Sequence, residues 1–239
     1  LRAAHAPRDP GEAGAARRRP VFGECLLFHL ARGRRRAAYR RDAAVPILVP
    51  PAVERRILAR LGFSLTRAQA RAVGALRRDL ARATPMRRLL LGDVGSGKTA
   101  VALWAILAAV ARGAQAALMA PTSLLAEQHF LGFRALLSGS RVRIVLLTSA
   151  SSARERARAA RALAAGEADL VVGTHALLSP GVRFRNLAMA VIDEQHRFGV
   201  VQRRALRAKG MPPHLLVLTA TPIPRTYAQA MFGDLAVSV

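Results

Sequence analysis

Residues 92–99 read Gly-Asp-Val-Gly-Ser-Gly-Lys-Thr, and this stretch decides the fold. It follows an expected strand at 88–91 and opens an apolar segment at 100–111, so the pattern predicts strand, tight loop and helix in succession. Such a loop curls its backbone N–H groups around phosphates, and the helix N-terminus adds positive potential. We therefore predict a P-loop that binds ATP through Gly92, Asp93, Val94, Gly95, Ser96, Gly97, Lys98 and Thr99.

Chemistry needs more than a phosphate loop, and further along the chain the sequence supplies the remaining groups. We expect Lys98 to reach the β- and γ-phosphates and Thr99 to offer its hydroxyl oxygen to Mg²⁺. Asp193 and Glu194 directly follow the apolar run 187–192, which places them at the carboxyl edge of a parallel sheet, where α/β folds bind ligands. Asp193 is expected to bind Mg²⁺, largely through its waters, and Glu194 to orient the attacking water.

The residues after these acids are candidates for coupling ATP hydrolysis to movement. Gln195 and His196 stand where polar side chains could sense the γ-phosphate and pass its loss to a neighbouring segment. The expected neighbour contains Thr219 and Thr221, at the end of another apolar strand.

Short apolar runs alternate with helical stretches after residue 64, which is typical of an α/β fold with a mostly parallel sheet flanked by helices. Continuous apolar strands indicate burial on both faces of the sheet. The expected strands are 88–91, 116–119, 142–147, 170–172, 187–192 and 215–219. The expected helices are 67–81, 98–111, 123–137, 153–165 and 200–208, after an N-terminal helix that begins near Val21.

The composition of the chain indicates which binding partners and which cellular compartment to expect. Lys+Arg 38 against Asp+Glu 14 gives a formal net charge of +24, which favours a polyanion such as nucleic acid, although an arginine- and alanine-rich composition is an equal alternative. Cys25 is the single cysteine, so no intrachain disulfide forms, as expected of a cytoplasmic protein. The longest apolar run, 100–111, is too short for the roughly 20 residues of a membrane span. No membrane partner is expected.

Five segments resemble the motifs of superfamily 2 helicases in their order along the chain. They are Gly92–Thr99, Ala120–His129, Val172–His175, Ile192–Val200 and Thr219–Thr226. The residues within these segments are similar to those of the RecG-type DNA helicases. The Mfd-type transcription-repair coupling translocases are the nearest alternative, but they usually carry an aromatic residue at the position of Ser96 and a glutamate at that of Gln195.

The resemblance implies roles for residues that composition and spacing do not single out. Gln69 matches an adenine-reading segment upstream of the P-loop. Thr122, Thr174 and His175 match residues that contact the DNA sugar-phosphate chain. Residues 1–20 are rich in Ala, Gly, Pro and Arg and show no apolar periodicity, which favours a linker or disordered segment. The resemblance implies 21–63 as a helical connector from an upstream wedge domain, and 64–239 as a RecA-like ATP-binding lobe.

The implied whole protein is a monomeric, cytoplasmic and nucleoid-associated enzyme that uses ATP to remodel forked and branched DNA. The sequence ends at Val239, before the second RecA-like lobe, whose motifs in this family carry the arginine finger. Because such a finger accelerates hydrolysis by roughly 10³ to 10⁵, we expect this segment alone to show little DNA-stimulated ATPase. A non-catalytic fragment that binds nucleotide and DNA remains the alternative from a different class.

Overall fold

The computed structural model describes residues 42–193, 212–220 and 235–238, with a few residues between Phe22 and Arg34. The chain divides into two compact units, Leu1–Arg41 and Asp42–Val239. The described residues of the first unit are helical, in the segment where apolar spacing predicts a helix. The second unit begins ahead of residue 64, so part of the expected connector packs into the lobe. The expected helix at 200–208 lies outside the described residues.

The described strands of the second unit form one seven-stranded sheet in the order β3-β4-β2-β5-β6-β1-β7, with every pair parallel. All six strands expected from the sequence are present, which confirms the α/β fold with a parallel sheet. The strands are β1 (Arg87–Leu91), β2 (Gln115–Met119), β3 (Ile144–Leu147), β4 (Leu170–Gly173), β5 (Leu187–Ile192), β6 (His214–Thr219) and β7 (Ala236–Ser238).

Helices cover both faces of the sheet, so its central strands are buried along their whole length. Leu90 and Leu118 pack into a core shared with α3, α4, α5 and α6, whereas Leu89 and Ala117 point into a second core with α7. The elements are α3 (Pro51–Leu61), α4 (Arg67–Leu80), α5 (Lys98–Val110), α6 (Ser123–Leu136), α7 (Ala153–Ala165) and the 3₁₀ turn η1 (His175–Leu178).

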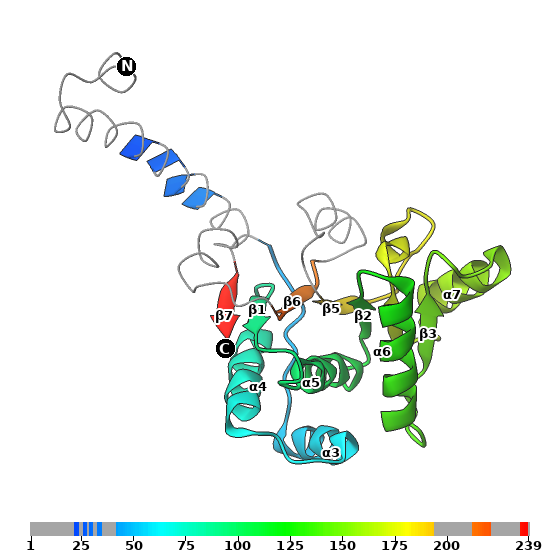
Figure 1. The fold of residues 1–239 in the computed structure, drawn as a ribbon, viewed down its shortest axis with the longest axis horizontal. Helices are drawn as coiled ribbons and strands as arrows, with labels where there is room; N and C mark the ends of the chain where they lie inside the picture. Colours follow the sequence, from blue (N-terminus) through cyan, green and yellow to red (C-terminus); the bar gives the residue numbers. More distant parts are fainter. Residues whose placement is uncertain are drawn as a thin grey trace. The chain divides into compact units, whose positions relative to one another are not determined.

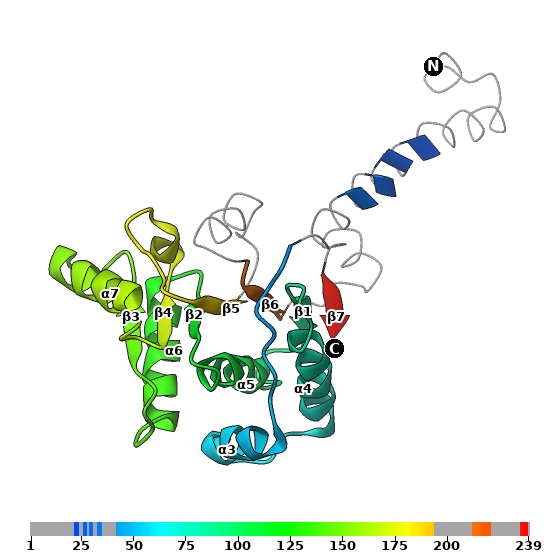
Figure 2. The same ribbon diagram turned by 180° about the vertical axis from the view of Figure 1, so that it is seen from behind.

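The helix after the phosphate loop is the most extensively buried of the described helices. Ten consecutive residues of α5, Ala100 to Ala109, are buried, as expected of a helix that is apolar on every side. Figures 1 and 2 show α5 between the strands and α3. Trp104 is fully buried, and its indole N–H has no hydrogen-bond partner among the described residues.

Two elements were missed by the sequence analysis. Helix α3 begins at Pro51 because proline is favoured in the first helical turn, where its missing N–H leaves no hydrogen bond unmade. The expected helices did not include this one, although it lies within the segment 21–63 that we expected to be a helical connector. Strand β7 is three residues long and pairs only with β1, so it carries no pattern that a sequence reading could detect. In addition, β3 begins at Ile144 and not at residue 142.

The segment 42–50 runs along the lobe in an extended conformation and is held by backbone hydrogen bonds. The N–H groups of Ala44 and Ile47 donate to Ala83 O and Leu80 O at 2.9 and 2.8 Å. The buried ring of His214 forms a further link: its Nδ1 accepts from Met86 N at 2.9 Å, and its Nε2 donates to Val45 O at 3.0 Å. This pairing requires the neutral ring with its proton on Nε2.

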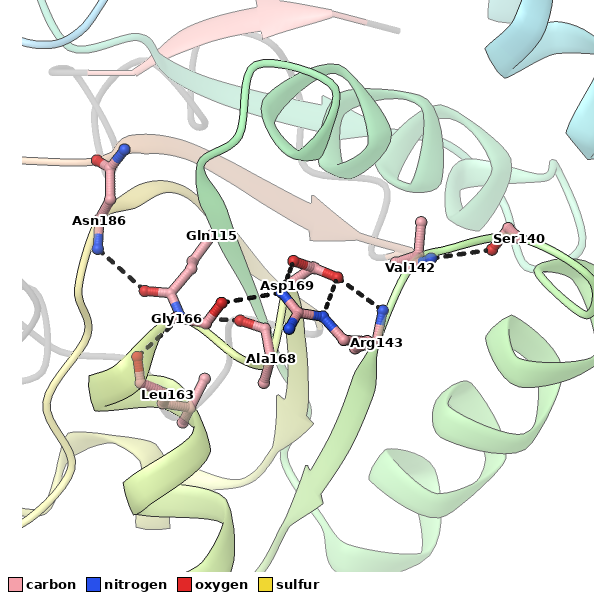
Figure 3. A network of polar contacts seen from close by, with 9 residues as sticks. All are labelled: Gln115, Ser140, Val142, Arg143, Leu163, Gly166, Ala168, Asp169 and Asn186. Atoms are coloured by element: carbon pink, nitrogen blue, oxygen red, sulfur yellow. Dashed lines mark hydrogen bonds and ion pairs between the residues drawn. The ribbon is translucent and has the colours of Figure 1, made fainter.

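A polar network ties together the amino-terminal ends of other strands at this same edge of the sheet (Figure 3). The buried Gln115 side chain donates to Leu163 O and Ala168 O and accepts from Asn186 N. Arg143 makes a two-pronged ion pair with Asp169. Burial works to raise the pKa of Asp169, but the hydrogen bonds from Arg143 outweigh it and lower the pKa.

The described part of the chain contains no helix of the length and apolarity that a bilayer crossing requires.

Removing the central aromatic of α5 is expected to destabilise the lobe strongly. Trp104→Ala should lower the free energy of unfolding by about 3–5 kcal/mol, because it leaves a large cavity in a rigid core. Trp104→Phe keeps most of the volume and removes an unsatisfied donor, so its loss should stay below about 1.5 kcal/mol. Urea unfolding followed by circular dichroism measures both, and equal losses would contradict this account of the core.

The His214 link predicts a dependence of stability on pH. Burial lowers the pKa of His214, and it outweighs the hydrogen bond to Val45 and the charge of Asp79, which work to raise it. In the unfolded chain the ring has a pKa of about 6.5, so the unfolded state binds a proton more readily than the folded state does. The stability contributed by His214 is therefore present above that pH and is lost as the pH falls below it.

Urea unfolding of the protein and of His214→Asn, at about pH 7.5 and about pH 5.5, tests this prediction. We expect the unaltered protein to lose more stability than His214→Asn on acidification, since the variant has no ring to protonate. Equal losses in the two proteins would show that other groups carry the pH dependence.

Candidate active site

The expected phosphate loop lies between β1 and α5, as its sequence predicts. Two of its glycines have left-handed backbone conformations, Gly95 with φ 79° and Gly97 with φ 78°, and Gly97 also forms the N-cap of α5. Ser96 N donates to Asp93 O at 3.1 Å, which closes the turn. The two left-handed glycines and this hydrogen bond give the loop its tight curl.

Lys98 folds back over this loop. Its Nζ donates to Gly92 O and to Asp93 O, at 2.7 Å in each case. The ammonium group thus lies against the loop carbonyls, where an incoming phosphate could compete for its protons. Thr99 lies next to it in the first turn of α5 and is exposed.

Gln69 joins the start of α4 to the phosphate loop. Its Oε1 accepts from Thr66 N at 2.9 Å and its backbone N donates to Thr66 Oγ1 at 3.3 Å, so the two residues form a capping box. Its Nε2 donates to Ser96 O at 3.0 Å. The structure thus brings Gln69 to the loop, while its adenine-reading role stays a prediction.

Three strand ends meet beside the loop. Gly92 N donates to Thr219 O at 3.3 Å, which joins the phosphate loop to the end of β6. Asp193 directly follows β5, and its N–H donates to Met119 O at 2.8 Å. Because β6 lies between β1 and β5, the loop and Asp193 are separated by two strand spacings, or about 10 Å.

A residue that the sequence analysis did not single out contacts Asp193. His129 on α6 places its Nε2 2.7 Å from Asp193 Oδ2, and both side chains are mostly buried, with 14% and 15% exposed. His129 is the last residue of the segment Ala120–His129, which we quoted for its resemblance to a superfamily 2 helicase motif. The sequence offers one clue to this contact. His129 lies two helical turns after Thr122, on the expected helix 123–137, which packs against the sheet.

The expected DNA-contact residues have different surroundings. Thr122 is exposed and caps α6, with its Oγ1 accepting from Leu125 N at 3.2 Å. Thr174 is buried, and its hydroxyl accepts from Ala176 N at the start of η1. His175 is exposed in that turn. All three follow the carboxyl ends of strands, on the edge that carries the phosphate loop. The expected site residues Glu194, Gln195, His196 and Thr221 lie outside the described residues.

The groups described suit Mg²⁺ bound to a nucleotide triphosphate. Thr99 offers a hydroxyl oxygen and Asp193 a carboxylate, and such oxygen ligands are those that Mg²⁺ takes together with substrate phosphates. The lysine ammonium and the loop N–H groups supply the positive potential that the phosphates need. A parallel sheet with such a loop at its carboxyl edge defines a P-loop nucleotide-binding lobe.

The family of this lobe follows from a comparison with known proteins. A family model described as DEAD/DEAH box helicase matches residues 66–230, and the chain belongs to this family. Its sequence is similar to that of the ATP-dependent DNA helicase RecG of Aquifex aeolicus (strain VF5), at 43% identity over 93% of this chain and 28% of the relative. The RecG protein of Bacillus subtilis (strain 168) is 45% identical over 100% of this chain and 35% of its own length.

The fold agrees with these sequence matches. The solved structure of RecG bound to a three-way DNA junction superimposes with a TM-score of 0.83 and 39% identity, covering 95% of this chain and 30% of that one. This similarity and the parallel sheet confirm the expected RecA-like helicase fold. The chain spans about a third of the length of the RecG proteins it matches.

Two glycines of the loop provide a matched test of its geometry. Alanine at either position meets the strain of a left-handed backbone, about 1–2 kcal/mol, but at Gly97 the new methyl group would also collide with the Gln69 side chain amide, whereas at Gly95 it meets open space. Gly97→Ala should therefore weaken binding of a fluorescent ATP analogue more than Gly95→Ala does. Equal effects would show that the contact with Gln69 does not constrain the loop.

Proposed function

We propose that the protein is an ATP-driven DNA-remodelling helicase of the RecG type, in which this chain supplies the ATP-binding lobe. The observation that carries the proposal is the convergence at the carboxyl edge, where Gly92 is hydrogen-bonded to Thr219 and Asp193 ends the next strand. A phosphate loop bonded directly to a second motif strand can pass a change in phosphate occupancy beyond the nucleotide. The similarity to RecG supports DNA as the substrate of that movement.

The residues take separate roles in this proposal. The loop N–H groups and Lys98 bind the phosphates, and Gln69 holds the loop from the side of α4 while reading the adenine edge. Thr99 and Asp193 would hold Mg²⁺, which neutralises charge on the phosphates when it is bound. Glu194 orients and polarises the attacking water, and Gln195 and His196 sense the γ-phosphate.

Coupling to DNA follows from the common edge of the sheet. Thr219 is buried at the end of β6 and is bonded through its carbonyl to the phosphate loop, and Thr221 follows two residues later. Thr122 and His175 are exposed beyond the ends of β2 and β4. We propose that this exposed edge contacts the DNA backbone and that the excess of arginine contributes to attraction.

The remaining domain plan is part of the same proposal. Residues 64–239 form the ATP-binding lobe, residues 21–63 connect it to an upstream wedge domain, and residues 1–20 are a linker. A second RecA-like lobe completes the catalytic cleft in a monomeric, cytoplasmic enzyme. The RecG relatives are about three times as long as this chain, which leaves room for such domains.

Two substitutions in the full-length protein separate binding from hydrolysis. Lys98→Ala should weaken ATP binding by about 10- to 100-fold, because it removes a charged donor to the phosphates. Glu194→Gln should leave binding nearly unchanged and lower turnover by about 10² to 10⁴, since it removes the group that activates water. A fluorescent ATP analogue measures binding, and phosphate release on a branched DNA measures turnover.

Arg158→Ala is the control, because it also removes one positive charge but lies on the exposed side of α7. It should leave both quantities unchanged. Full turnover in Glu194→Gln would refute the assigned water-positioning role. ATP hydrolysis that branched DNA fails to stimulate in the full-length protein would count against the DNA-remodelling function.

A further inference from the structure

We propose that His129 is a positioning residue for the metal-binding carboxylate of Asp193. The inference rests on the proposed function, in which Asp193 holds Mg²⁺ with ATP. The inference is argued from one short contact: His129 Nε2 lies 2.7 Å from Asp193 Oδ2, although the two residues are 64 positions apart in the sequence. Because an ionised carboxylate can only accept, the imidazole N–H donates.

A second contact holds each partner of this bond in place. The His129 ring lies 5.9 Å from the ring of Phe133, at an interplanar angle of 35°, and Phe133 is fully buried one turn further along α6. Asp193 is anchored through its backbone N–H to Met119 O at the end of β2. The imidazole and the carboxylate therefore meet from two fixed elements, so their bond sets the direction of the carboxylate.

The orientation of this carboxylate matters for Mg²⁺ in particular. Mg²⁺ requires near-ideal octahedral geometry and does not adapt to a misdirected ligand. The contact with His129 involves one carboxylate oxygen, Oδ2, so the other oxygen can still accept from a water molecule of Mg²⁺, the way in which Asp193 is expected to bind the metal. A hydrogen-bonded partner of this kind typically changes metal affinity or activity by about 10- to 100-fold.

A purely structural role for His129 makes a different prediction. If the bond only fastened α6 to the sheet, its loss would lower stability and would reduce nucleotide binding equally with and without Mg²⁺. A positioning role confines the loss to the Mg²⁺-dependent part of binding. The Mg²⁺ concentration for half-maximal binding of an ATP analogue distinguishes the two.

The experiment uses three variants of the full-length protein with a fluorescent ATP analogue, titrated with MgCl₂ and compared with binding in EDTA. Leucine in His129→Leu removes the donor. In His129→Asn the amide is too short to reach Asp193, whereas in His129→Gln it can donate from nearly the position of Nε2. The control, Gln128→Ala, changes the exposed neighbour on the same helix.

We expect His129→Leu and His129→Asn to need about 10-fold more Mg²⁺ for half-maximal binding, with affinity in EDTA unchanged. His129→Gln and Gln128→Ala should match the unaltered protein. If the leucine variant fails to fold, the contrast between asparagine and glutamine decides, because both introduce an amide.

An unchanged Mg²⁺ requirement in His129→Asn would overturn the inference and leave the proposed function intact. So would an equal loss of binding with and without Mg²⁺. Absence of Mg²⁺-dependent nucleotide binding in the unaltered protein would overturn the proposed function itself, and the inference with it.

Discussion

The burial of α5 is the constraint on which the rest of the lobe depends. This helix is apolar on every side and packs against the sheet, α3 and α4, so neither its axis nor its first turn can shift without opening the core. Its first residue is Lys98 and its N-cap is Gly97. The core therefore fixes the position of the phosphate loop, and the loop needs few contacts of its own to keep its shape.

Around that fixed loop, the site is assembled by long-range hydrogen bonds from different elements. Gln69 reaches Ser96 from α4, Thr219 accepts from Gly92 at the end of β6, and His129 reaches Asp193 from α6. Parallel pairing makes this possible, since it brings every carboxyl strand end to one edge. Each of these bonds links two elements that are far apart in the sequence.

Local patterns in the sequence were sufficient for the phosphate loop, six strands and four of the described helices. They succeeded because the central strands are continuous apolar runs and the loop has fixed residue types at fixed spacing. They failed where the determinant was not local. Helix α3, which begins at Pro51, was not among the expected helices. Strand β7 is too short to carry a pattern, and among the described strands it pairs with β1. Nothing near His129 in the sequence indicates Asp193, 64 positions away.

The hydrogen bonds of His214 link the segment that enters the lobe to the two strands that end beside the phosphate-binding site. His214 is the first residue of β6. Its ring accepts a hydrogen bond from Met86, just before β1, and donates one to Val45, in the segment 42–50. The same two strands end at the phosphate loop and at Thr219. The point where the chain enters the lobe and the phosphate loop therefore lie at opposite ends of the same two paired strands.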